Sequence, residues 1–163
     1  MPTLREVLDD WYERVCVTQR AHYLSADHFK RKSYWLGVPV IGLTTVVGTS
    51  VFATIQKQPV LWQQVTAGLA SVAAAILASL QTFLGYAERA EKHRVAGAKY
   101  GALGRELEVL RASDRAENDE ILRELRKRLD ALALESPNNP IWIYHRAGAA
   151  LPVRSSGRES SGS

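Results

Sequence analysis

Two long stretches of this chain carry no Asp, Glu, Lys, Arg or His, and they constrain its fold more than any other feature. They cover residues 33–56 and 58–87, and little more than Lys57 and Pro59 separates their apolar parts. The hydrocarbon core of a bilayer is about 30 Å thick, and a helix needs roughly 20 apolar residues to cross it. Residues 34–55 and 62–84 supply 22 and 23 residues. Because the turn between them is so short, they predict an antiparallel transmembrane hairpin.

The average composition alone would suggest a soluble domain, in which both segments are buried core helices. Mean hydropathy is only −0.16, because two very apolar segments are averaged with highly charged flanks. The positions of the aromatic residues favour the membrane. Tyr34 and Trp35 open the first span, Trp62 opens the second and Tyr86 closes it. These are the levels at which an aromatic belt meets the lipid headgroups.

Basic residues gather on one side of the predicted hairpin. Lys30, Arg31 and Lys32 precede the first span, several more follow the second, and the turn carries only Lys57. The positive-inside rule then places both termini of this multi-pass membrane protein in the cytoplasm. The first 33 residues lack the apolar core of a cleaved signal peptide. Lys30, Arg31 and Lys32 next to the span indicate contact with anionic lipid headgroups, and we do not interpret the formal net charge of +4 as nucleic-acid binding.

The flanks predict helices, so the expected fold class is all-α: a two-helix transmembrane hairpin continuous with a cytoplasmic helical bundle. An amphipathic cytoplasmic helix covers residues 1–33 and enters the first span at 34–55 without a break, with a kink expected at Pro39. A short periplasmic turn covers 56–61, and the second span covers 62–86. The second span is expected to continue as helix to about Ala112. Its seam consists of Ala96, Tyr100, Leu103, Leu107 and Leu110.

Two further helices complete the cytoplasmic region, which covers residues 87–151. Ser113 and Asp114, with Glu117, predict a cap for a helix that ends near Ser136 and Pro137. Its apolar face is expected to consist of Leu122, Leu125, Leu129 and Leu132. Asn139 and Pro140 are expected to cap and start a short helix with Ile141, Tyr144 and Leu151 on one side. Residues 152–163 are rich in Ser and Gly and predict a disordered tail.

Each span has a face of small or hydroxylated residues. On the second span this face consists of Gln64, Gly68, Ser71, Ala75, Ala78, Thr82 and Gly85, and on the first of Gly42, Thr45 and Thr49. Small residues mark places where helices approach closely in lipid. These faces therefore predict contacts between the two spans or between subunits. In an oligomer they could also line a water-filled path. Neither span carries a charged residue, which argues against active transport.

Motifs for catalysis or cofactors are not evident. The four histidines are scattered without cysteine partners, so no metal site is expected. Gly97, Gly101 and Gly104 suit close helix packing better than a phosphate loop, and the lone Cys16 suits a small packed side chain. We expect no enzyme and no cofactor. The candidate residues for gating or signal contact are Pro39, His93, Arg94 and Tyr100.

The arrangement resembles one known family. The sequence AERAEKHR at 87–94, followed by Ala98, Lys99 and Tyr100, is similar to the SLATT proteins. So are the amphipathic first helix, the short-turn hairpin, and LALESP at 132–137 with Tyr144 beyond it. The similarity extends to about Gly148. SLATT proteins are two-transmembrane effectors of bacterial conflict systems, found with nucleotide-second-messenger synthases or nucleotide sensors. The resemblance implies a membrane-damaging effector that stays inactive until a partner signals, and it supplies no catalytic residues.

Two functions compete. In the first, hairpins assemble as a homo-oligomer and permeabilise the inner membrane when a nucleotide second messenger, or its synthase or sensor protein, signals to the cytoplasmic helices. In the second, the hairpin only anchors a helical scaffold that docks a partner. Ion leakage from an assembled protein separates the two.

Overall fold

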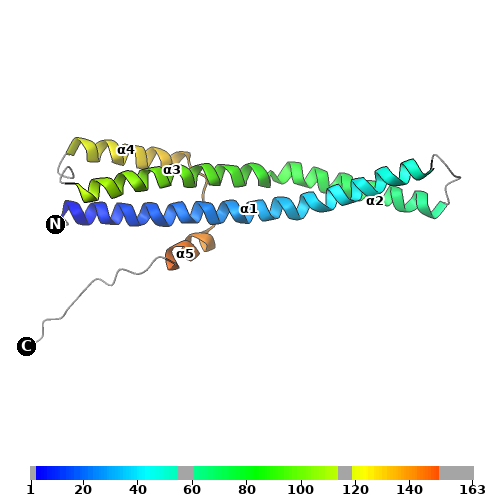
Figure 1. Ribbon diagram of the computed structural model, residues 1–163, viewed down its shortest axis with the longest axis horizontal. Coiled ribbons are helices and arrows are strands. Elements are labelled where there is room, and N and C mark those ends of the chain that lie inside the picture. Colours follow the sequence, from blue (N-terminus) through cyan, green and yellow to red (C-terminus); the bar gives the residue numbers. More distant parts are fainter. Residues whose placement is uncertain (1–2, 55–60, 114–118, 151–163) are drawn as a thin grey trace, which may run out of the picture. The chain divides into compact units, whose positions relative to one another are not determined.

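The computed structural model describes residues 3–54, 61–113 and 119–150, and these parts are helical throughout apart from short connections. The helices are α1 (Leu4–Thr54), α2 (Leu61–Leu84), α3 (Tyr86–Ala112), α4 (Asp119–Glu135) and α5 (Ile141–Ala149) (Figure 1). The all-α prediction is confirmed. The chain divides into two compact units. One consists of the chain up to Ser25 and from Lys92 onward, and the other is Ala26–Glu91.

Helix α1 runs for 51 residues without a break, as its sequence predicts. It begins with a capping box, because the Glu6 amide donates to Thr3 Oγ1 at 3.3 Å and the Thr3 amide donates to Glu6 Oε2 at 2.8 Å. Pro39 lies inside the helix, which continues beyond it to Thr54. The kink expected at Pro39 stays a prediction.

The second long helix is interrupted, which corrects the expectation of a continuous helix to Ala112. Gly85 separates α2 from α3 and has a φ of 56°, in the left-handed region that glycine adopts most easily. The interruption is one residue long. The Gly85 amide still donates to Gln81 O at 3.3 Å, and the Arg89 amide donates to Gly85 O at 3.0 Å.

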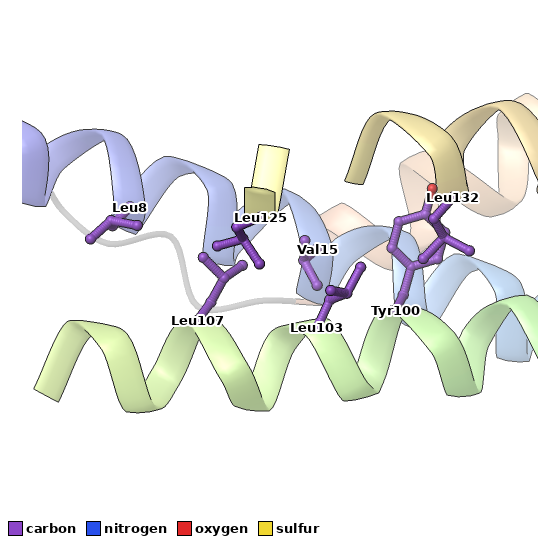
Figure 2. Packing of buried hydrophobic residues seen from close by; sticks show 7 residues of the cluster. All are labelled: Leu8, Val15, Tyr100, Leu103, Leu107, Leu125 and Leu132. Atoms are coloured by element: carbon purple, nitrogen blue, oxygen red, sulfur yellow. The ribbon is translucent and has the colours of Figure 1, made fainter. Parts of the chain in front are cut away.

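The core of the first unit joins α1, α3 and α4. Figure 2 shows its buried side chains in a row between these helices. They are Leu8, Val15, Tyr100, Leu103, Leu107, Leu125 and Leu132. Both seams expected from the leucine spacing are thus confirmed. The α4 helix ends at Glu135, next to the predicted boundary, whereas its predicted cap at Asp114 and Glu117 lies outside the described residues.

Three glycines of α3 bring its backbone close to α1. A Cβ added at Gly97 would lie 3.3 Å from the Tyr23 ring, and one at Gly101 would lie 2.6 Å from Gln19 Nε2. At Gly104 it would lie 3.4 Å from Val15 Cγ1. The interpretation of these glycines as packing residues is confirmed.

Helix α5 packs on α1 with a different face from the one we expected. Ile143 and Ala147 are buried against Ala21, while Ile141 is 75% exposed and Leu151 lies outside the described residues. Pro140 occupies the N-cap position without a side-chain cap, so Asn139 does not cap α5. The Asn139 side chain instead accepts a hydrogen bond from Ser25 Oγ of α1.

The second unit is the apolar hairpin. Among the described residues, the stretch Leu61–Ala112 is long and apolar enough to span a membrane, with a mean hydropathy of 1.7 in its most apolar part, of which 6% is buried. Bulky apolar side chains remain on the outside: Trp35 is 81% exposed and Phe83 is 85% exposed. An apolar surface of this kind suits a lipid environment better than water. The predicted first span runs past Thr54, beyond the described residues.

Candidate functional site

The two helices of the hairpin meet through one face of α2, which includes Ala70, Ala73, Leu77 and Gln81, all half-buried, and the buried Ala74. The helices also approach each other at Gly37, where an added Cβ would lie 3.3 Å from Gln81 Nε2. The intramolecular contact therefore uses mainly alanines, together with Leu77 and Gln81.

The predicted small-residue faces lie elsewhere on the hairpin. Nine of their ten members are exposed, namely Gly42, Thr45, Thr49, Gln64, Gly68, Ser71, Ala75, Ala78 and Thr82; Gly85, at the helix break, is half-buried. A Cβ added at Gly42 or Gly68 would meet no atom within 4 Å. The faces thus do not form the contact between the two spans. Contact between subunits, or a pore lining, stays a prediction for them.

The hydroxyl groups on these faces donate hydrogen bonds to their own helix. Thr45 Oγ1 donates to Ile41 O at 2.8 Å, and Ser71 Oγ donates to Ala67 O at 2.9 Å. Thr82 Oγ1 donates to Ala78 O at 3.1 Å. Because the donor is satisfied within the helix, such a residue tolerates lipid, while its oxygen can still accept from water or from another chain.

Aromatic and basic side chains pair where the charged region meets the first apolar span. The rings of Phe29 and Tyr86 stack with centroids 6.1 Å apart. Lys32 Nζ lies 5.5 Å from the Tyr86 centroid, and Lys30 Nζ lies 6.0 Å from that of Tyr34. Cations over aromatic rings at this level suit the headgroup region of a bilayer.

The most unusual polar contact of the first unit is a pair of buried histidines. His22 of α1 and His93 of α3 place their Nδ1 atoms 3.0 Å apart, and the two residues are only 2% and 3% exposed. The ring of Tyr100 stacks on His22, with centroids 5.4 Å apart and an angle of 17°. One turn along α1, Ser25 Oγ donates to Asn139 Oδ1 at 2.9 Å. The His22 contact joins α1 to α3, and the Ser25 contact joins α1 to the segment before α5.

The surroundings keep both histidines neutral. Burial, and to a smaller extent the charge of a protonated His93, lowers the pKa of His22 to about 4. Burial also lowers the pKa of His93. In the neutral pair one Nδ1 must donate and the other accept, so the two rings carry opposite tautomers. Burial raises the pKa of the Tyr100 phenol, although the nearby Ser136 hydroxyl acts in the opposite direction. Among the described residues Ser136 Oγ has no partner in hydrogen-bond geometry.

Of the four predicted signal-contact residues, the structure brings two together, His93 and Tyr100. Arg94 and Pro39 are exposed. His22, Ser25 and Asn139 were missed. The repeat Leu4, Leu8, Trp11, Val15, Thr18 has steps of four and three, and continuing it would have reached His22 and Ser25. For Asn139 no such signal exists, because it lies outside any helix.

The exposed apolar hairpin suggests a membrane protein. The comparisons with known proteins agree. The chain belongs to the family described as SMODS and SLOG-associating 2TM effector domain family 4, whose model matches residues 4–152. It is thus a membrane effector of the SLATT type, as the sequence resemblance implied. No curated protein and no solved structure matches the chain.

Proposed function

We propose that this protein oligomerises in the bacterial inner membrane and permeabilises it when a nucleotide signal or a partner protein acts on its helical bundle, as part of a defence system. The observation that carries this proposal is the exposure of the small, hydroxyl-bearing faces of the hairpin. A single chain leaves Thr45, Ser71 and Ala75 uncovered, and two helices cannot enclose a pore. Several hairpins are needed to bury these faces against one another.

The chemistry of the spans sets the kind of pore. Neither span contains an ionisable group of the kind that pumps and proton relays require. The Thr and Ser oxygens can accept hydrogen bonds from water, but they provide no ring of charge. Such a pore would discriminate poorly between ions and would close by dewetting. In this proposal both termini are cytoplasmic, and the bundle receives the signal.

Support for the trigger comes from the family description, which associates these two-transmembrane effector domains with SMODS and SLOG domains. Long helices connect the bundle to the spans. In particular, α1 includes both Leu8 of the bundle core and Gly42 of the predicted first span. A rearrangement of the bundle would thereby reach the membrane.

The scaffold remains the second candidate, because the interhelical contacts of the bundle would serve a docking surface equally well. Reconstitution in liposomes separates the two. Triggered protein should release a small ionic dye, and Thr45→Arg or Ser71→Arg should change the conductance while the bundle keeps its helical circular dichroism signal. If assembled, triggered protein retains the dye, the pore is excluded and the scaffold takes its place.

A further inference from the structure

A cavity of about 300 Å³ lies in the first unit, where α1, α3 and α4 meet. This volume is at the lower end of the range for small-molecule sites. Apolar side chains form part of the wall, including Val15 and Leu129, and the aromatic residues Trp11 and Tyr100 add to it. The cavity thus has the apolar and aromatic walls that hold a planar ring.

Two arginines lie at this cavity, Arg14 on α1 and Arg126 on α4. Arg14 is held by Asp10, with Nε to Oδ1 at 3.1 Å and a second contact, Nη2 to Oδ2, at 3.0 Å. Arg126 is held much less firmly. Its nearest acidic partner is Asp130, with Nε to Oδ2 at 3.8 Å, which is too long for a hydrogen bond.

This loose pairing leaves guanidinium donors of Arg126 available. Both members of this ion pair are mostly exposed: the Arg126 side chain is 73% exposed and the Asp130 side chain is 70% exposed. Exposed pairs of this kind contribute little to stability. An incoming carboxylate or phosphate could replace Asp130 and form charge-assisted hydrogen bonds with the planar fork of Arg126. Thr18 also lines the cavity, and its hydroxyl donates to Arg14 O at 2.8 Å.

We infer that this cavity is a binding site for a small anion attached to a planar aromatic ring, with the ring against Trp11 and Tyr100 and the anionic group on Arg126 and Arg14. A nucleoside monophosphate and an aromatic carboxylate share this chemistry. The ligand contacts all three helices that form the core. It also touches Tyr100, whose ring stacks on the buried His22. The inference rests on the proposed function in one respect: binding here is one way for a small molecule to trigger the effector.

Binding is measured on the full-length protein in detergent by isothermal titration calorimetry. The probes are adenosine monophosphate and indole-3-carboxylate, with adenosine as the ring without the anion and inorganic phosphate as the anion without the ring. At least one of the two ring-bearing anions should bind more tightly than adenosine and phosphate. Which of them does so identifies the source of the ligand.

Two substitutions locate the site. Arg126→Gln should weaken binding roughly tenfold, because it removes a charge-assisted hydrogen bond. Arg14→Gln should also weaken it. Arg123→Gln is the matched control, since it changes the same charge on the same helix at an exposed residue that does not line the cavity, and it should have no effect.

The inference is overturned if neither ring-bearing anion binds at millimolar concentration, or if inorganic phosphate binds as tightly as the ring-bearing anions do. It is also overturned if the Arg126→Gln variant binds these anions as tightly as the unaltered protein does. The same preparations are then tested for dye release from liposomes. Binding without release would leave the site intact and count against the pore. Dye release by another trigger, without binding of either ring-bearing anion, would support the pore and count against the site.

Discussion

At His22 and His93 two ionisable rings occupy positions that leucines hold elsewhere in the same helical repeat. Burying a polar ring is unfavourable unless a hydrogen bond replaces its contacts with water. The bond between the two Nδ1 atoms provides this replacement, and the stacked Tyr100 covers one face. The contact between α1 and α3 thus depends on keeping charge out of this buried site: burial disfavours a proton on His22, and two protonated rings would have no acceptor between them. Removing one ring leaves a buried polar group unpaired, which costs about 1–3 kcal/mol.

The first prediction concerns pH. Because the folded-state pKa of His22 is about 4, against an ordinary value of 6.5, the unfolded chain binds the proton more readily. The contribution of the neutral pair is complete above pH 6.5 and is lost as the pH falls toward 4, with an upper limit of about 3 kcal/mol for His22. The melting temperature of the helical bundle, followed by circular dichroism in detergent, should drop over this range.

His22→Phe should flatten the pH dependence, because the ring that resists protonation is gone. His145→Phe serves as the control, since His145 is exposed on α5 and should leave the dependence unchanged. An identical acid transition in His22→Phe would show that the pair does not cause it.

At the level of helices, Gly85 is the one described residue at which the long return helix changes conformation. A φ of 56° costs a residue with a Cβ about 1–2 kcal/mol, so glycine is required there by conformation and not by space. An added Cβ would meet no atom within 4 Å. The α2–α3 junction is consequently a defined backbone feature close to one end of the second predicted span.

The second prediction compares two glycines in equally open surroundings. Gly85→Ala should lower the melting temperature, corresponding to about 1–2 kcal/mol, or force a continuous helix. Gly42→Ala should be neutral or stabilising by about 0.5–1 kcal/mol, because Gly42 lies within α1, where alanine is preferred. Thermal melts of both variants in one detergent make the comparison, and equal effects would contradict the role of the left-handed backbone.

The helices themselves could be predicted from sequence, because the leucine spacing in the bundle and the charge-free spans depend on local periodicity. The break at Gly85 could not be predicted, since glycine is tolerated within helices and only the backbone conformation shows that the helix is interrupted there. The prediction of the buried face of α5 was wrong, because the contact with Ala21 determines which face is buried and Ala21 is far away in sequence. The repeats of α1 and α3 reach His22 and His93, but the sequence does not show that these two positions face each other, because they are 71 residues apart.

For the whole molecule, the exposed small faces bear on assembly. The third prediction is that Ser71→Leu or Ala75→Leu prevents oligomer formation, because a larger side chain separates helices that need to approach closely. Both residues are exposed in the single chain, so the hairpin itself should still form. Leu69→Ala is the control, since this bulky residue is 67% exposed and lies on the opposite side of α2 from the small face. Chemical crosslinking in membranes measures the oligomer, and equal tolerance on both faces would refute the assignment.

The fourth prediction concerns topology. With Cys16→Ser as background, a cysteine introduced at Gln58 should react with a membrane-impermeant maleimide from the periplasmic side, and tags at both termini should remain protected. Reaction only after the inner membrane has been opened would reverse the orientation that the Lys and Arg distribution predicts.

The histidine pair also gives the molecule its own spectroscopic reporter. The shared imidazole proton lies in a bond between two rings that water hardly reaches, so it should exchange with solvent only when α1 and α3 separate. Its exchange lifetime, followed by nitrogen-15 NMR of labelled histidines, would give the frequency at which the resting bundle opens. A trigger that loosens this contact would shorten the lifetime before any ion crosses the bilayer.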